Sequence, residues 1–253
     1  MHTLLAMSAM HDRYLHSPSP GGPSIFEIYH TTQCASFLNQ KLSQPITPSD
    51  RDPLWMAVTF MGILTFSSLD TSTPTHAWPL RAADPSDLEW VRMAEAKMAV
   101  MHLAAPRRGD GLFRAMASEY EQMFDPVSSS SSGAGVIPAS LARLCLLSET
   151  SSKENNPYFT AVHTLAPLLG RRNRAMRSMV LAFTSQMEPV FKMLLRQKDP
   201  VALLLLALWY EKAAGIIWWV RHRASVECRA ICLYLQREHG KDREILAMLP
   251  KPS

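Results

Sequence analysis

The chain is poor in cysteine and in charge, and each shortage excludes a class of protein. Its 253 residues include four cysteines, at positions 34, 145, 228 and 232, which are too few and too dispersed for a disulfide-based scaffold. No signal-peptide pattern opens the sequence, so we expect a reducing intracellular compartment. Charged residues make up 19% and hydrophobic residues 47%, a composition typical of a globular protein rather than a disordered one.

Binding to nucleic acid and insertion into a membrane are also not expected. The net charge is only +4, and the densest basic cluster, Arg171 to Arg177, has no interleaved aromatic residues for base stacking. The apolar run from Val201 to Tyr210 is shorter than the ~20 residues that span a bilayer. We therefore predict no direct contact with nucleic acid by this chain and no membrane span.

The sequence lacks the short motifs of several common enzyme classes, because no G-x-S-x-G, G-x-x-x-x-G-K or H-E-x-x-H occurs. One acidic pair, Asp84 and Asp87, has the D-x-x-D spacing that could hold magnesium and a diphosphate, as in terpene-cyclase-like helical enzymes. Pro85 and Ser86 place this pair at the start of a helix rather than on a helix face. We therefore predict that the chain is not an enzyme and needs no cofactor, and we keep an enzyme with an apolar cavity as a third alternative.

Apolar residues recur at three- and four-residue spacing almost throughout, and no useful stretch has the two-residue period of a strand. This pattern predicts an all-α fold, an irregular bundle of about ten helices in one domain over residues 1–253. The serine run within residues 127–136 predicts a flexible surface loop in that domain. The expected helices cover residues 1–16, 24–42, 54–66, 86–105, 113–124, 138–147, 157–169, 173–186 and 189–197, and then two more, one from Pro200 up to a break at Gly215 and one from Ile217 to Leu235.

Two parts of the chain are expected to form the core. The helix from Leu54 to Phe66 has hardly any polar face, which predicts a central position. Near the C-terminus, Pro200 follows a capping residue, Asp199, and begins a helix that pairs with the next one to form a buried C-terminal helix pair. For the helix over residues 86–105, Ser86 and Glu89 fit the S-x-x-E capping box.

The second helix of the C-terminal pair has two contrasting faces. One is apolar, and the opposite face carries Arg221, Arg223, Glu227 and Arg229. Cys228 and Cys232 are one turn apart on this helix, with His222 and His239 nearby as further candidate metal ligands. Structural zinc usually takes two closely spaced cysteine pairs on loops, so we expect no metal site and interpret both cysteines as small apolar residues of a helix seam.

Several blocks of the chain resemble the C-terminal regulatory domain of fungal zinc-cluster transcription factors of the sterol-uptake-control type. The resemblance rests on the order of these blocks over nearly the whole chain and not on any catalytic or metal signature. The matching blocks are MHTLLAMSAMHDRYL at the start, HAWPLRAADPSDLEWVRMAEAKMAV at residues 76–100, NNPYFTAVHTLAPLL at 155–169, DPVALLLLALWY at 199–210, the Trp218 and Trp219 pair, and RASVECRAICLYL at 223–235.

The resemblance implies a transcription regulator whose helical domain senses a ligand, with a nuclear location and a cytoplasmic pool. The implied partners are a sterol or another apolar small molecule and other transcription factors or coregulators. The sequence is compatible with a homo-oligomer and does not decide whether the chain dimerises. The six-cysteine binuclear zinc cluster of the family is absent from this sequence, which leaves two alternatives: a DNA-binding module is missing, or the protein acts through a partner. The alternative is an accessory regulator or interaction protein of a fungal secondary-metabolite gene cluster that does not bind DNA.

Aromatic and methionine side chains are the candidates for an apolar ligand pocket, because such pockets are lined mainly by large apolar groups. Core filling is the competing interpretation for the same residues, and the resemblance to a sterol-binding domain is what favours the pocket. The predicted lining residues are Trp55, Phe60, Met61, Trp209, Trp218 and Trp219.

Overall fold

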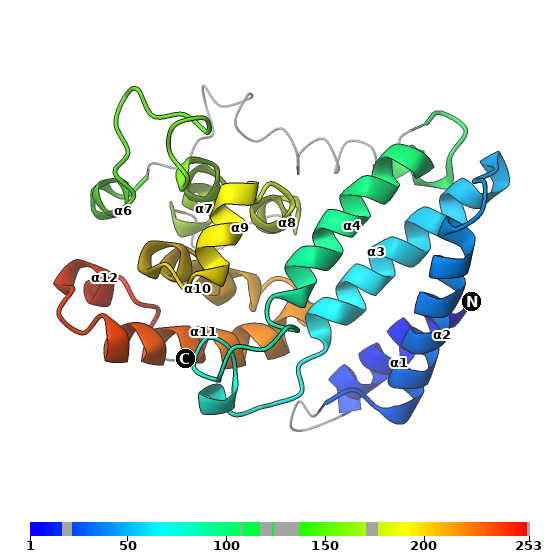
Figure 1. The fold of residues 1–253 in the computed structure, drawn as a ribbon, viewed down its shortest axis with the longest axis horizontal. Helices are drawn as coiled ribbons and strands as arrows, with labels where there is room; N and C mark the ends of the chain where they lie inside the picture. The colour runs from blue at the N-terminus through cyan, green and yellow to red at the C-terminus, as the bar shows by residue number, and fades with distance from the viewer. Residues whose placement is uncertain (17–21, 107, 117–122, 124–136, 171–176, 252–253) are drawn as a thin grey trace. The chain divides into compact units, whose positions relative to one another are not determined.

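The structure is a computed structural model that describes residues 1–16, 22–106, 108–116, 123, 137–170 and 177–251. Every regular element in these ranges is a helix and none is a strand, which confirms the predicted all-α fold (Figure 1). The chain divides into two compact units, Met1–Ser72 with Leu88–Ser118 and Thr73–Asp87 with Glu119–Ser253. The predicted flexible loop at residues 127–136 lies outside the described residues. None of the described helices is both long enough and apolar enough to cross a bilayer.

The first unit is built around its third helix. It contains α1 (His2–His16), α2 (Ile25–Leu42), α3 (Arg51–Ser67) and α4 (Glu89–Ala104), with short 3-10 turns at Pro48–Asp50 and Leu112–Met116. Helix α3 packs against α4, α1 and α2, as its nearly complete apolar surface predicts. Phe66 of α3 meets Trp90 of α4 edge to face, with ring centroids 5.1 Å apart.

The second unit is built around α10 (Pro200–Ala213). This helix packs against α7 (Phe159–Gly170), α8 (Arg177–Ser185), α9 (Pro189–Arg196) and α11 (Arg221–Glu238), and every residue from Ala202 to Tyr210 is buried. The predicted burial of the C-terminal helix pair is therefore confirmed for α10 and for one face of α11. The remaining elements are α6 (Ala139–Leu144), α12 (Arg243–Ala247) and 3-10 turns at Pro74–His76 and Trp218–Val220.

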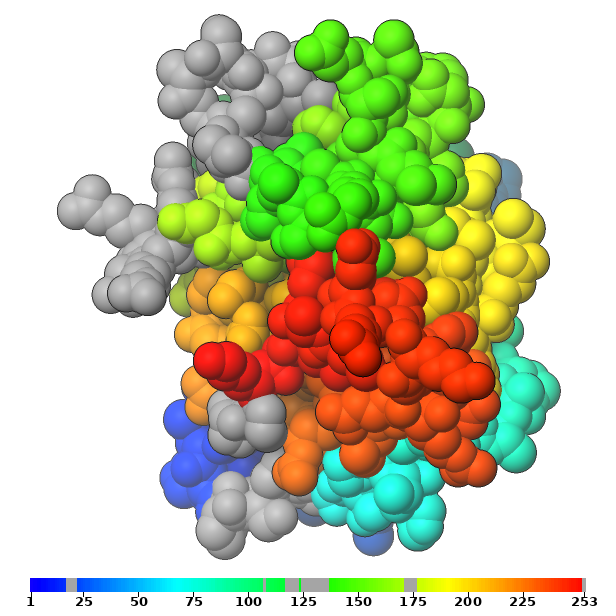
Figure 2. Space-filling view, turned by 90° about the vertical axis from the view of Figure 1, so that its left-hand side faces the viewer, coloured from blue at the N-terminus to red at the C-terminus, as the bar shows by residue number. Residues whose placement is uncertain are grey.

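Three polar contacts illustrate how this unit is held together. The carboxylate of Asp199 accepts a hydrogen bond from the Ala202 amide at 2.8 Å, which confirms the predicted cap of α10, and another from the Tyr158 hydroxyl at 3.0 Å. Helix α12 also lies beside α6 (Figure 2). Arg143 of α6 and Glu244 of α12 form an ion pair there at 3.0 Å. The Asp199 side chain therefore starts α10, and the ion pair of Glu244 with Arg143 holds α12 against α6.

The predicted capping box at Ser86 and Glu89 is wrong. Helix α4 begins at Glu89, and the preceding residue, Leu88, adopts a left-handed conformation with φ 57° and ψ 29°. The Ser86 hydroxyl donates instead to Asp84, while the Asp87 carboxylate accepts from the Asp84 amide at 2.9 Å. The Ser86 hydroxyl takes part in this local turn with Asp84 and does not bind the Glu89 amide, so the capping box does not form.

The second error concerns the polar face of α11. Arg221 and Arg229 are exposed as expected, but Arg223 and Glu227 are only 8% and 3% exposed. They bind each other one helical turn apart, and Glu227 also accepts a hydrogen bond from the Tyr210 hydroxyl of α10. A charged pair can be buried when its members satisfy each other and a third polar group, which a helical pattern alone does not reveal.

Candidate ligand groove

The first unit contains an open groove between α1, α2 and α3, with a volume of about 530 Å³. This lies within the range of 300–1,000 Å³ that is typical of small-molecule sites. The lining side chains are mainly apolar. They are Met1, His2 and Thr3 from α1 and its start, Cys34, Phe37, Leu38 and Lys41 from α2, Asp50, and Pro53, Leu54, Met56 and Ala57 from α3.

An ion pair provides the charged groups of the groove. Lys41 Nζ lies 2.9 Å from the Asp50 carboxylate, which also accepts hydrogen bonds from the hydroxyl and amide of Thr47 at 2.6 Å and 2.8 Å. The Thr47 hydroxyl, followed by Lys41, lowers the pKa of Asp50 to about 2. The carboxylate is therefore ionised at neutral pH, and the Lys41 and Asp50 pair places two charged, hydrogen-bonding groups in a mainly apolar lining.

Buried small side chains form another part of the lining. Thr3 and Cys34 are 4% and 6% exposed, and burial raises the pKa of the Cys34 thiol despite its hydrogen bond with Thr3. The thiol therefore stays neutral near pH 7 and behaves as a small, weakly polar group. This part of the groove is therefore suited to an apolar part of a ligand rather than to a charged group.

Side-chain contacts between α1 and α2 fix two walls of the groove. Arg13 donates two hydrogen bonds to the Glu27 carboxylate, both at 2.8 Å. Burial alone would raise the pKa of Glu27, but the bonds from Arg13 and Ser24 outweigh it and the pKa is lowered. Ser24 and Glu27 also form a capping box that starts α2, so one carboxylate both begins the helix and holds it to α1.

A histidine pair adds a second contact between these helices. The Nδ1 atoms of His2 and His30 are 2.8 Å apart, so the N–H of one ring donates a hydrogen bond to the ring nitrogen of the other. The His2 ring also stacks on Phe37, with centroids 5.7 Å apart. Because His2 and Phe37 both line the groove, this contact positions groove side chains directly.

The six predicted pocket residues are divided between the two units, and none of them lines this groove. Trp55 and Met61 are buried in α3 and Phe60 is half-buried, while Lys97 of α4 lies 5.2 Å from the centroid of the Trp55 ring. Their predicted joint pocket stays a prediction. The groove residues lie on other positions of α3 and on α1 and α2.

In the second unit, Trp209 is fully buried in a way that favours a core role. Its Nε1 donates to the carbonyl of Val180 at 2.8 Å, and its ring stacks on Phe183 with centroids 5.5 Å apart. Trp218 and Trp219 are half-buried in the 3-10 turn before α11. Of the three predicted residues in this unit, these two tryptophans are therefore not fully buried.

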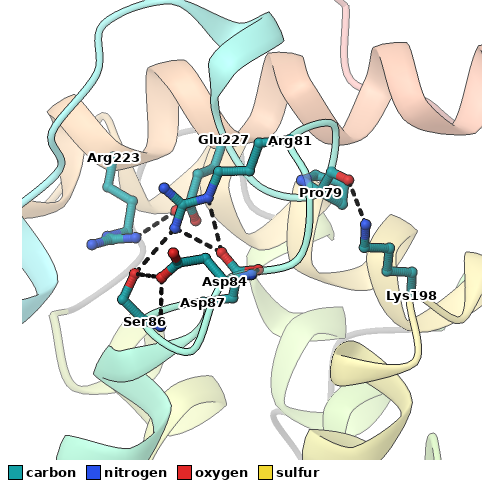
Figure 3. A network of polar contacts seen from close by, with 8 residues as sticks. All are labelled: Pro79, Arg81, Asp84, Ser86, Asp87, Lys198, Arg223 and Glu227. Atoms are coloured by element: carbon teal, nitrogen blue, oxygen red, sulfur yellow. Dashed lines mark hydrogen bonds and ion pairs between the residues drawn. The ribbon is translucent and has the colours of Figure 1, made fainter.

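The segment from Thr73 to Asp87 in the second unit contains a cluster of charged side chains and is contacted by Lys198 (Figure 3). Arg81 pairs with Asp87 at 2.7 Å, and Lys198 donates to the carbonyl of Pro79 at 2.7 Å. Asp84 accepts from the Ser86 amide at 2.8 Å, and its hydrogen bonds with Ser86 lower its pKa. These contacts use the D-x-x-D carboxylates to hold the loop, and we assign the cluster a structural role.

The cysteine pair on α11 is half-buried beside α10. The Cys228 thiol donates to the carbonyl of Ala207 with a distance of 3.5 Å, and its hydrogen bond with Cys232 raises the pKa of Cys228 and lowers that of Cys232. Within the described part of the chain, no three histidine, cysteine or carboxylate side chains gather in a way that could hold a metal ion. The pair itself therefore has two ligands at most.

No family model, curated protein or solved structure matches this chain. The resemblance to the regulatory domain of fungal zinc-cluster factors therefore stays a prediction, and the groove is the main structural basis for a functional proposal.

Proposed function

We propose that the chain is a ligand-sensing regulatory domain that acts in transcription regulation, with its ligand in the groove between α1, α2 and α3. The observation that carries the proposal is the groove itself, which combines about 530 Å³ of space, a mainly apolar lining and one ion pair. The missing catalytic motifs of the sequence support a binding role over an enzymatic one.

The ligand that fits this lining has an apolar body and one polar end. Apolar contacts with side chains such as Leu38, Leu54 and Met56 would supply most of the binding energy. The Lys41 and Asp50 pair would bind a single hydroxyl or a similar group. A sterol has this chemistry, and it is the ligand class that the sequence resemblance implies.

Regulation requires that the ligand favour one arrangement of the helices over another, because a ligand shifts an equilibrium only by its differential affinity. In the described part of the chain, the polar contacts that join α1 to α2 include those of Arg13 with Glu27 and of His2 with His30. Occupation of the groove would stabilise this helix pair in its present arrangement. Other transcription factors or coregulators in the nucleus would then recognise that arrangement.

A reporter assay tests this function. The chain is fused to an unrelated DNA-binding domain in yeast, and reporter transcription is measured with normal and depleted ergosterol. We expect transcription to change with sterol supply, and Ala57→Phe, which places a ring in the groove, to remove the response without lowering the protein level. A response that survives in Ala57→Phe would exclude this groove as the sensor.

An accessory interaction protein without a ligand is the second candidate. It is favoured by large apolar side chains on the surface of α2, including Phe26 at 72% and Ile25 at 83% exposure. In the reporter assay this candidate predicts activity that is independent of sterol supply in both the wild-type chain and Ala57→Phe.

A further inference from the structure

Helix α2 has the reverse of the usual distribution of polar and apolar residues. Its fully buried residues are Glu27 and Cys34, whereas four large apolar or aromatic side chains of its first turns face solvent. Their exposed fractions are 83% for Ile25, 72% for Phe26, 54% for Ile28 and 54% for Tyr29, and Phe37 at 55% lies further along the helix. Single exposed apolar residues are ordinary, but a contiguous group of this kind marks an interaction surface.

The exposed face of α2 also carries no free charge. Among the 18 residues of the helix only Glu27 and Lys41 are charged. Glu27 is buried against Arg13, and Lys41 is paired with Asp50. The exposed face continues beyond Tyr29 with uncharged polar residues, Thr32, Ser36, Asn39 and Gln40. Depletion of charge together with enrichment of aromatic residues is the composition that distinguishes the centre of a protein interface from the rest of a surface.

The size of this face suits a stable dimer. The exposed areas of Ile25, Phe26, Ile28, Tyr29 and Phe37 together are on the order of 700 Å², close to the ~800 Å² that each partner contributes to a standard interface. We propose that this face of α2 binds the same face of a second copy of the chain, so that the protein is a homodimer in solution. This inference does not depend on the proposed function.

A second copy fits this face better than a lipid surface does. Two identical faces meet across a two-fold axis, where each residue approaches its own counterpart or a neighbour of it. An uncharged face can pair with itself without placing like charges together. Helices that lie on membranes instead carry several lysines or arginines beside their apolar face, and α2 has only Lys41.

The test is the molecular mass of the full chain in solution, measured by light scattering after size exclusion over a range of concentrations. The wild-type chain should have about twice the monomer mass of 28.4 kDa. Phe26→Glu and Tyr29→Glu should each weaken association by at least about 100-fold, because each places two carboxylates together in an apolar contact. Leu103→Glu is the matched control, since Leu103 is 52% exposed on α4, and it should leave the dimer intact.

Circular dichroism shows whether the variants keep the helical content of the wild type. If one of the two glutamate variants does not fold, the other still tests the proposal. A wild-type chain that stays monomeric up to about 100 µM overturns the proposal, as does a dimer that survives both glutamate substitutions. Monomers that bind lipid vesicles or a different protein through Phe26 would also overturn it, because the face would then have another occupant.

Discussion

Burial changes the pKa of Lys97 on α4. It lies over the ring of Trp55, and burial lowers its pKa to about 8. Among the described residues no carboxylate forms an ion pair with it, so the folded state bears the cost of desolvating an ammonium group, offset in part by the aromatic ring. The side chain therefore affects stability in a pH-dependent way.

We predict that Lys97→Met raises the free energy of unfolding by about 1–2 kcal/mol at pH 7. A lysine in the unfolded chain has a pKa near 10.4, so between about pH 8 and 10.4 the unfolded state binds more protons and wild-type stability rises with pH. The advantage of the methionine variant should therefore shrink from pH 8 to pH 10. Urea denaturation of the wild type and the variant at pH 7, 8 and 10 measures this difference in the free energy of unfolding. A variant less stable than the wild type at pH 7 would show that burial of the Lys97 charge does not destabilise the folded state.

The buried contact of Arg223, Glu227 and Tyr210 is the second prediction at this scale. Burial, and then the charge of Glu227, raises the pKa of Tyr210 well above its usual value, so its hydroxyl remains a donor. Glu227→Leu should lower stability by about 3–5 kcal/mol, because it leaves a buried guanidinium and a hydroxyl unpaired. Arg223→Met combined with Glu227→Leu should cost clearly less than the sum of the single changes.

Arg229→Met on the exposed face of α11 is the control for this cycle and should change stability by less than about 0.5 kcal/mol. Strictly additive effects of Arg223→Met and Glu227→Leu would mean that the two side chains do not act as a pair.

At the scale of the helices, the structure separates real caps from apparent ones. Ser24 starts α2, since its hydroxyl accepts from the Glu27 amide at 3.2 Å, whereas Ser86 bonds to Asp84 and caps no helix. Ser24→Ala should therefore lower the free energy of unfolding by about 1 kcal/mol. Ser86→Ala removes an exposed contact and should lower it by less than about 0.5 kcal/mol, and denaturation curves of both variants in one buffer give the comparison. An equal loss in both would restore the capping box at Ser86.

The elements that the sequence predicted well are those with strong local signals. Asp199 followed by Pro200 and a long apolar run specifies where α10 begins and that it is buried. The predictions that failed concern positions whose environment depends on contacts between residues far apart in the sequence. Glu227 is buried because Tyr210 of another helix binds it, and the groove is formed by side chains from α1, α2 and α3 that share no sequence motif. The apolar face of α2 was visible in IFEIY at residues 25–29, but its exposure depends on which side of the helix binds α1.

At the scale of the whole molecule, the groove and the face of α2 belong to the first unit, and α10 organises the second. Ligand binding and self-association are therefore both proposed for the first unit, and both use α2. Cys34, Leu38 and Lys41 of this helix line the groove, Ile25, Phe26, Ile28 and Tyr29 form the exposed apolar face, and Phe37 belongs to both.

Direct binding of a sterol to the purified chain tests the central claim. Dehydroergosterol, a fluorescent sterol, is titrated into the wild-type chain, into Ala57→Phe in the groove and into Trp218→Ala in the second unit. We expect saturable binding by the wild type, at least about tenfold weaker binding by Ala57→Phe because the added ring occupies the groove, and unchanged binding by Trp218→Ala. No binding by the wild type, or binding that only Trp218→Ala weakens, would contradict the account.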